Sequence, residues 1–338
     1  MDNKSNVNIG LIGCGRISDK HIAAVNNIKN ARIIAVCDID TEKAGKLAKK
    51  LSINKIYKNY KDIINDKDVD VVSICTPSGL HSVMAINALR QGKDVIIEKP
   101  ISLTVSEAKK VIKFAKKYNG ILLPVMQNRF NPAITFLKNN SDKLGRINYI
   151  EATCFWYRPQ DYYNDGWHGT KKMDGGVLMN QGIHYVDMIC YLLGSLPKEV
   201  SAYGGTYGHR MECEDVVSLN IKFKNNVIAS LRANTISYPE NFEGSITVFF
   251  EKATVKIGGK AMNQIISWKG EGAEPAVEFS GLKSDDIYGG GHSGVIKNMC
   301  DLKNKISKPY MTGEDALVSV KIIKGAYKSI SKNKNIKI

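Results

Sequence analysis

From residue 8 to about residue 128, short apolar runs rich in β-branched residues alternate with amphipathic stretches, and few architectures accommodate that order. The apolar runs predict strands at residues 7–12, 31–38, 69–76, 94–98 and 121–126. The amphipathic stretches, which begin with capping residues, predict helices at residues 19–28, 41–51, 78–91 and 105–118. Strands that alternate with helices form a parallel sheet flanked by helices. We therefore predict a first α/β domain over residues 1–128.

After Asn128, strand-like runs follow one another more closely. They lie at residues 147–156, 198–206, 215–223, 227–235, 245–250 and 253–257. Turn signals such as Asn225-Asn226 separate neighbouring runs, which indicates an antiparallel or mixed sheet. Further helices are predicted at residues 180–193, 294–305 and 313–331. The second domain, residues 129–338, is thus predicted to be α+β with a large, open, mostly antiparallel sheet.

Composition indicates an ordinary globular protein. The 338 residues include seven cysteines without a Cys-x-x-Cys pair, which favours reduced, buried thiols over a disulfide scaffold or a metal site. No apolar run reaches the roughly 18 residues of a membrane-spanning helix, and residues 1–8 are polar. We therefore expect a cytoplasmic protein with no metal and no membrane partner.

The formal net charge of +15 is compatible with nucleic acid, a membrane surface or an anionic small molecule as partner. The lysines are dispersed, and their clusters at residues 43–50, 109–117 and 328–337 have the spacing of solvated helix faces and of a chain end. No nucleic-acid-binding module is recognisable. An anionic small molecule is therefore favoured, and nucleic acid is not expected.

A glycine-rich segment at residues 10–18 lies where the first predicted strand turns into the first predicted helix. Gly13 permits the tight turn, and Gly15 lets the backbone approach a pyrophosphate that the helix N-terminus stabilises. Ser18 is a small-residue variant of the third position of the dinucleotide fingerprint. The candidate cofactor contacts in this turn are Gly13, Gly15, Arg16 and Ile17.

The second predicted strand ends at Asp38, near the place expected for an acid that accepts hydrogen bonds from the adenosine ribose. A carboxylate there repels a 2′-phosphate, so we predict NAD rather than NADP. The alternative is that Asp38 caps the following turn. Two further segments follow strands, and both are predicted to face the nicotinamide half of the cofactor. They contain Thr76, Pro77 and His81 in one case and Glu98 and Lys99 in the other.

These segments, together with Gly182-x-His184-x-x-Asp187, occur in an order and at separations that resemble the Gfo/Idh/MocA oxidoreductases. The resemblance spans nearly the whole chain, and the Glu-Lys-Pro and Gly-x-His-x-x-Asp elements are its most specific parts. It implies a Rossmann domain followed by a domain whose open sheet forms a substrate face and an oligomer contact. A homodimer or homotetramer is therefore expected.

Oxidation of a secondary alcohol needs a hydride acceptor and a base for the hydroxyl proton. Lys99 suits this task, since desolvation beside a cationic nicotinamide lowers the pKa of a lysine. By family analogy, Lys99 and His184 share the proton-transfer role. Asp187 lies one helical turn beyond His184 and would orient that histidine or a sugar hydroxyl. The alternative is that Asp187 is an ordinary helix residue with no role in the site.

Three segments resemble a narrower branch, the WlbA/WbpB-like enzymes, which oxidise C3 of UDP-N-acetylglucosaminuronic acid. They are residues 127–132, residues 162–172 and residues 175–184. The middle segment is long, polar, aromatic and basic, which suits a sugar diphosphate. The candidate substrate contacts are Lys99, Gln127, Arg129, Arg158, Tyr163, Trp167, His168, Lys171, Asn180, His184, Asp187 and His292.

Many relatives carry Asp where Asn180 stands, and an uncharged amide tolerates an anionic substrate better. His292 follows a predicted substrate loop, Tyr288-Gly-Gly-Gly, whose glycines allow close approach. The resemblance implies conversion of the UDP-sugar and NAD to a 3-keto sugar and NADH, a step toward diacetamido uronic acids of surface polysaccharides such as the O-antigen of lipopolysaccharide. Some relatives keep the NADH bound and reoxidise it with 2-oxoglutarate.

Two other functions stay open. The first is a dehydrogenase of inositol or another unactivated sugar, which would not need the aromatic and basic segment at residues 158–172. The second is a catalytically silent NAD-binding sensor, against which the presence of Lys99 and His184 argues.

Overall fold

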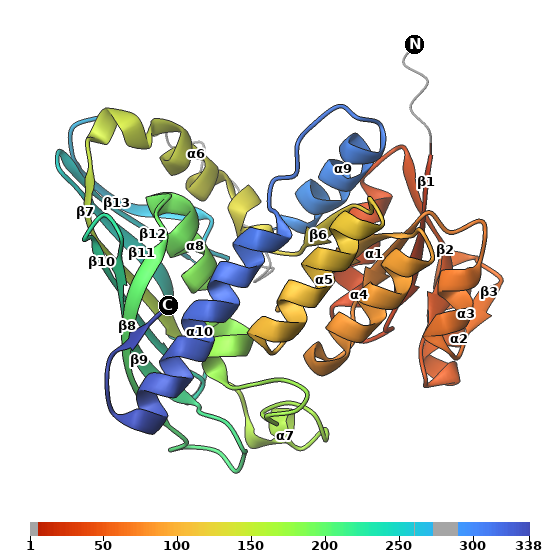
Figure 1. Cartoon of the computed structure of the whole chain (residues 1–338), viewed down its shortest axis with the longest axis horizontal. Helices are drawn as coiled ribbons and strands as arrows, with labels where there is room; N and C mark the ends of the chain where they lie inside the picture. The colour runs from red at the N-terminus through yellow and green to blue at the C-terminus, as the bar shows by residue number, and fades with distance from the viewer. Residues whose placement is uncertain (1–5, 260, 273–289) are drawn as a thin grey trace. The chain divides into compact units, whose positions relative to one another are not determined.

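The computed structural model describes residues 6–259, 261–272 and 290–338 (Figure 1). The chain divides into two compact units. The first unit contains Met1–Met126 and His292–Leu317, and the second contains Gln127–Gly291 and Val318–Ile338. The predicted domains, 1–128 and 129–338, do not include this return of residues 292–317 to the first unit. The helical spacing of that segment predicts a helix, but it does not indicate which unit the apolar face of the helix covers.

The first unit is built on a six-stranded parallel sheet in the order β3-β2-β1-β4-β5-β6, which is the Rossmann order. Its strands are β1 Val7–Ile12, β2 Ala31–Cys37, β3 Lys55–Tyr57, β4 Val71–Ile74, β5 Asp94–Ile97 and β6 Leu122–Pro124. The predicted parallel sheet is therefore confirmed. Strand β3 escaped prediction because three residues are too few to show a period.

Helices connect these strands. They are α1 Ser18–Asn26, α2 Thr41–Leu51, α3 Tyr60–Asn65, α4 His81–Arg90 and α5 Val105–Lys117, with the 3₁₀ turn η1 Ser78–Leu80 before α4. The side chains of Asp40, Asn59 and Thr104 accept backbone N–H bonds at the starts of α2, α3 and α5. The returning segment forms α9 His292–Lys303, which packs against α1, and the first turn of α10 Gly313–Lys332.

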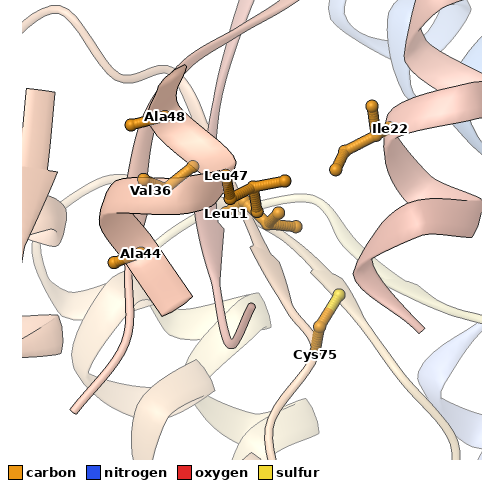
Figure 2. Close-up of a cluster of buried hydrophobic side chains, with 7 residues drawn as sticks. All are labelled: Leu11, Ile22, Val36, Ala44, Leu47, Ala48 and Cys75. Carbon is orange, nitrogen blue, oxygen red and sulfur yellow. The ribbon is translucent and has the colours of Figure 1, made fainter. Parts of the chain in front are cut away.

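A compact apolar cluster lies between the sheet and its helices, and Figure 2 shows seven of its side chains. They are Leu11, Ile22, Val36, Ala44, Leu47, Ala48 and Cys75. They come from β1, β2, α1, α2 and the segment after β4. This packing sets the ends of β1, β2 and β4 at one edge of the sheet, where open α/β sheets bind their ligands.

The second unit contains an eight-stranded sheet in the order β13-β12-β11-β7-β10-β9-β8-β14. Its strands are β7 Ile147–Phe155, β8 Pro197–Gly205, β9 Val216–Phe223, β10 Ile228–Asn234, β11 Glu243–Phe250, β12 Ala253–Gly258, β13 Gln264–Gly270 and β14 Ile336–Lys337. Strand β10 pairs with β7 in parallel, and the other neighbours pair antiparallel. The predicted open, mostly antiparallel sheet is therefore confirmed.

Short helices accompany this sheet. They are α6 Pro132–Asn140, α7 Gln160–Tyr163 and α8 Ile183–Leu193, the 3₁₀ turns η2 Gln127–Phe130 and η3 Ser141–Leu144, and the π-helical turn η4 Leu178–Gly182. Buried and exposed residues alternate along β9, so one face of the sheet is covered and the other is open. In the described part of the chain, every helix is too short or too polar to cross a membrane.

Candidate functional site

Gly13 forms the predicted turn after β1. Its φ of +97° lies in the left-handed region, and a Cβ on it would lie 2.6 Å from the carbonyl oxygen of Cys75. Around the place where a Cβ on Gly15 would stand, the described residues other than Gly15 and its two chain neighbours leave 4 Å of open space. This open space precedes the N-terminus of α1, so the turn fits a pyrophosphate.

Asp38 follows β2, and both oxygens of its carboxylate accept backbone hydrogen bonds. The N–H of Cys14, in the glycine turn, donates to Oδ2 at 2.8 Å, and the N–H of Asp40 donates to Oδ1 at 2.9 Å. The cap of α2 is Asp40 itself, which accepts from the N–H groups of Glu42 and Lys43. Asp38 therefore ties the end of β2 to the glycine turn, and its contact with a ribose stays a prediction.

An Asp38→Asn variant is expected to weaken the preference for NADH over NADPH. Opposed like charges cost several kcal/mol, so removal of this carboxylate should lower the ratio of the NADPH to the NADH Kd by at least about tenfold. Fluorescence titration of the bound nicotinamide measures both constants. Asp40→Asn removes a neighbouring carboxylate and should leave the ratio unchanged. Equal ratios in the wild type and the Asp38 variant would contradict the assignment.

His81 links the two segments that were predicted to face the nicotinamide. Its Nδ1 lies 2.7 Å from the carbonyl oxygen of Pro100, and its Nε2 lies 2.8 Å from that of Thr76. Burial lowers the pKa of His81, whereas the two carbonyl oxygens favour the protonated ring. His81 thus holds the Thr76-Pro77 turn and the Lys99-Pro100 turn together, and a direct cofactor contact by His81 stays a prediction.

Glu98 follows β5 and is buried with two histidines of the first unit. His21 Nε2 lies 2.9 Å and His292 Nε2 lies 3.5 Å from Glu98 Oε1. Glu98 was predicted to contact the cofactor and His292 the substrate, and both contacts stay predictions. His21 was not predicted, although it lies on the buried face of α1 beside Ile22 and Val25, which was the available signal.

In the second unit, an aromatic and basic cluster surrounds α7. Its members are Trp156, Arg158, Tyr162, Tyr163, Trp167 and His168. The Arg158 guanidinium carbon lies 4.9 Å from the Trp156 ring centroid and 5.5 Å from that of Tyr162. The His168 ring centroid lies 3.9 Å from that of Tyr162 and 3.6 Å from that of Trp167. Arg158, Tyr163, Trp167 and His168, all predicted substrate contacts, are thus brought together.

Polar contacts fix the orientation of this cluster. Nδ1 of His168 lies 2.5 Å from a carboxylate oxygen of Asp165. The Tyr163 hydroxyl donates to Oγ1 of Thr235 at 2.8 Å, and burial raises the pKa of Tyr163 to about 12. That hydroxyl therefore stays protonated at neutral pH. Lys171 lies nearby in sequence, is exposed, and donates its backbone N–H to Glu212.

Asn180, in η4, pairs with a carboxylate that the sequence analysis did not single out. Its Nδ2 donates to Asp174 Oδ1 at 2.6 Å and to the Tyr162 hydroxyl at 3.4 Å. Asp174 is 2% exposed, and its other oxygen accepts the N–H of Gly169. An aspartate at position 180 would face this carboxylate, and like charges at such a distance repel. The amide at position 180 therefore suits its neighbour Asp174, besides any role toward substrate.

Arg129 and Asp187 form a buried, bidentate ion pair. Arg129 Nε donates to one oxygen of Asp187 at 2.9 Å and Nη2 donates to the other at 2.7 Å. The two residues are 8% and 1% exposed, and the guanidinium carbon lies 4.7 Å from the ring centroid of Tyr191. Each charge is thus compensated inside the second unit. The substrate contacts of Arg129 and Asp187 stay predictions.

The remaining candidates of the second unit lie in or beside short helices. His184 is the second residue of α8 and is 8% exposed, directly after the π-helical turn η4, a kind of turn that is frequent at functional sites. Gln127 opens η2, and a Cβ on Gly291 would lie 2.2 Å from its carbonyl oxygen. The close approach that Gly291 permits is thus to backbone. Tyr288, also predicted to lie near substrate, is outside the described residues.

Glu214 is a buried carboxylic acid next to η4. Its Oε1 accepts the N–H of Leu178 at 3.1 Å and the Tyr327 hydroxyl at 3.1 Å. Burial raises the pKa of Glu214 from 4.5 to about 7. The stability that this group contributes is therefore complete below pH 4.5 and is lost as the pH rises through about 7.

A Glu214→Gln variant should consequently gain stability relative to the wild type as the pH rises from about 5 to about 8. The expected change in the difference is about 3 kcal/mol in the free energy of unfolding. Urea unfolding at the two pH values measures it. Glu243→Gln is the control: burial raises the pKa of Glu243, but hydrogen bonds from Ser245 and Lys256 outweigh it and lower that pKa. The contribution of Glu243 therefore changes only below pH 4.5, and the stability difference of this variant should stay constant between about pH 5 and about pH 8. A pH-independent difference for Glu214→Gln would contradict the prediction.

Two family models match most of the chain. The model of the GFO_IDH_MocA oxidoreductase family, an NAD-binding Rossmann fold, matches residues 7–125. The model of the GFO/IDH/MocA C-terminal domain matches residues 139–256. The first range contains all six strands of the parallel sheet, and the second contains β7 to β11 and the first part of β12.

Individual relatives cover different shares of the chain. A solved structure of the WlbA dehydrogenase from Bordetella pertussis, in complex with NADH and UDP-GlcNAcA, is 31% identical, covers 99% of this chain and 98% of that chain, and has a TM-score of 0.91. Myo-inositol 2-dehydrogenase of Thermotoga maritima is 25% identical over 98% of both chains. The uncharacterized oxidoreductase YrbE of Bacillus subtilis is 27% identical over 65% of this chain, which spans 64% of that protein.

Proposed function

Because this chain belongs to the Gfo/Idh/MocA oxidoreductase family and carries its NAD-binding Rossmann domain, we propose that it oxidises the C3 hydroxyl of UDP-N-acetyl-D-glucosaminuronic acid with NAD. The product is the 3-keto sugar, a precursor of diacetamido uronic acids in surface polysaccharides. Full-length similarity to a dehydrogenase solved with NADH and UDP-GlcNAcA supports this substrate. In this proposal the active protein is a homo-oligomer of the cytoplasm.

NAD supplies the hydride acceptor for the hydrogen on C3, and the chain must supply a base for the hydroxyl proton. We assign that base to Lys99, with His184 sharing the proton transfer. One alcohol and one NAD⁺ give one ketone, one NADH and one proton. Lys99 is the second residue after β5, and the carbonyl oxygen of the next residue, Pro100, is held by His81. A base on a fixed turn keeps its orientation toward the reacting carbon.

The observation that carries the substrate assignment is the aromatic and basic cluster around α7. It holds the Arg158 guanidinium against the rings of Trp156 and Tyr162, and the His168 ring lies beside those of Tyr162 and Trp167. A guanidinium recognises phosphate or carboxylate, and flat rings pack on a sugar or a nucleobase. A diphosphate, a uronate and uracil in one molecule would use all of these groups.

Similarity to myo-inositol 2-dehydrogenase favours a second candidate, the oxidation of an unactivated cyclic polyol. Such a substrate has no anionic group that Arg158 and His168 could bind. We therefore rank it below the nucleotide sugar. The third alternative, a silent NAD-binding sensor, would not need Lys99 and His184.

Isothermal titration of the NADH-bound protein discriminates these candidates. UDP-N-acetylglucosaminuronate should bind. UDP-N-acetylglucosamine, which carries a hydroxymethyl group in place of the carboxylate, should bind at least about tenfold more weakly if that charge is recognised. Myo-inositol should bind least. An Arg158→Met variant should weaken both UDP-sugars. Tight binding of myo-inositol without binding of either UDP-sugar would contradict the proposal.

A further inference from the structure

Two buried histidines of the first unit, His21 and His292, converge on the carboxylate of Glu98, the residue before Lys99. Glu98, His21 and His292 are 5%, 1% and 4% exposed. Glu98 Oε1 lies 2.9 Å from His21 Nε2 and 3.5 Å from His292 Nε2. The ring centroids of the two histidines lie 5.3 Å apart in an edge-to-face arrangement. We refer to these three residues as the Glu98 cluster.

The Glu98 cluster connects to the backbone of Lys99. The N–H of Lys99 donates to Glu98 Oε2 at 3.1 Å, so one carboxylate oxygen contacts the histidines and the other contacts Lys99. On the far side of the cluster, His21 Nδ1 lies 2.8 Å from Oγ of Ser73, in the middle of β4. A continuous series of hydrogen bonds therefore runs from the sheet to the turn that carries Lys99.

The charges within the cluster favour a hydrogen-bonded ion pair. Burial opposes charge on His21, but the neighbouring Cys75 and Glu98 outweigh it and raise the pKa of His21 to about 10. Burial likewise opposes charge on Glu98, but the two histidines outweigh it and lower the pKa of Glu98. Removal of one partner from such a buried pair leaves the other charge uncompensated.

The three side chains also have the composition of a metal site, since their ligand atoms all lie within 4.8 Å of one another. Ligands of one tetrahedral zinc ion, each about 2.0–2.2 Å from it, are separated by roughly 3.3 Å or more. The 2.9 Å between His21 and Glu98 is shorter than this and is an ordinary hydrogen-bond distance. The geometry therefore favours direct bonding over coordination.

We propose that His21, Glu98 and His292 are positioning residues for Lys99: the two histidines fix the Glu98 carboxylate, and the carboxylate fixes the Lys99 backbone at the end of β5. The inference rests on the proposed role of Lys99 in proton transfer. It also assigns a function to the segment 292–317 that returns to the first unit. His292 begins α9, and α9 packs against α1, on which His21 lies. Docking of α9 would then complete the support of the catalytic turn.

The same strand offers a matched control at its other end. Asp94 begins β5 and is 8% exposed. Its Oδ1 accepts the N–H of Ile121 at 2.7 Å, and Lys303 of α9 donates to its Oδ2 at 2.8 Å. Asp94 is therefore also a buried carboxylate that holds a backbone N–H and a cation of the returning segment, but it lies away from Lys99.

The test compares Glu98→Ala, Glu98→Gln, His292→Phe and Asp94→Asn with the wild type. With whichever member of a panel of UDP-sugars and inositol is oxidised, Glu98→Ala should lower kcat about 10- to 100-fold and change the KM for NAD far less. Glu98→Gln keeps the shape and one acceptor oxygen, so its kcat should lie between those of Glu98→Ala and the wild type. The kcat of His292→Phe should be similar to that of Glu98→Gln. Asp94→Asn should lose stability in urea but keep kcat within about twofold of the wild type.

A readout that needs no substrate accompanies these rates. Hydrogen exchange of the peptide that contains the Lys99 amide should be faster in Glu98→Ala and His292→Phe and unchanged in Asp94→Asn, because only the first two release that N–H. If all four variants lost stability with no change in kcat or in this exchange, the cluster would be merely structural and the inference would be wrong.

A parallel Lys99→Ala variant separates the two proposals. Loss of kcat in Lys99→Ala with normal kcat in Glu98→Ala would overturn the positioning role alone. Normal kcat in Lys99→Ala would overturn the role of Lys99 itself and leave the Glu98 cluster nothing catalytic to position. If no member of the panel is oxidised, the proposed function fails, and the exchange rates still decide whether the cluster fixes the Lys99 backbone.

Discussion

Replacement of Lys99 by alanine is expected to lower kcat for NADH formation by about 10²- to 10⁴-fold, the range that a general acid or base contributes. The Kd for NADH should change little, because the side chain acts on the substrate hydroxyl. The remaining His184 would support the residual rate. Steady-state kinetics with saturating NAD, together with fluorescence titration of NADH, measure the two quantities.

Lys93 is the matched control for this variant. It directly precedes β5, whereas Lys99 lies just beyond the other end of the same strand, and its Nζ donates to the carbonyl oxygens of Asp66 and Val69. Lys93→Ala should therefore reduce stability and leave kcat unchanged. Near-normal kcat in both Lys99→Ala and His184→Ala would remove the basis for proton transfer by these residues.

The second large effect concerns stability. Asp187→Ala is expected to lower the free energy of unfolding by about 3–5 kcal/mol, because it leaves the Arg129 guanidinium buried without its counter-charge. Both nitrogens that bind Asp187 would lose their acceptors, and burial prevents water from replacing them. Urea unfolding monitored by tryptophan fluorescence measures the loss.

Two further variants delimit this interpretation. Combining Asp187→Leu with Arg129→Met removes both charges and should restore much of the stability that Asp187→Ala loses. Glu151→Ala breaks an ion pair with the largely exposed Arg232 on the sheet and should cost less than about 1 kcal/mol. If Asp187→Ala lowered the free energy of unfolding no more than Glu151→Ala does, the buried ion pair would contribute no more to stability than the exposed one.

Much of the fold could be predicted from periodicity. The parallel strands of the Rossmann unit are buried on both faces, so they appear in the sequence as short, nearly continuous apolar runs such as β1. The short elements β3 and α3 span three and six residues and leave too weak a pattern. The return of α9 to the first unit was not predictable, since it depends on a tertiary contact with α1.

The sequence allowed us to predict which residues lie in the candidate site. It did not allow us to predict their hydrogen-bond partners. Strand ends and the glycine turn indicate where a dinucleotide binds, because topology alone places them at one edge of the sheet. The partners of Glu98 and Arg129 are His21 and Asp187, which lie 77 and 58 residues away in the sequence. Asp174 lies only six residues before its partner Asn180, but that separation is not a helical spacing. No spacing rule joins such residues, so the buried pairs became visible only in the structure.

The most direct test of the central claim is the formation of NADH, followed by its near-ultraviolet absorbance, when UDP-N-acetylglucosaminuronate is added to the protein with NAD. The protein should be present in stoichiometric amounts, so that NADH which stays bound is also detected. We predict NADH with this substrate and less or none with UDP-N-acetylglucosamine or myo-inositol. NADH formed from myo-inositol or another free sugar, and none from the UDP-sugar, would contradict the account.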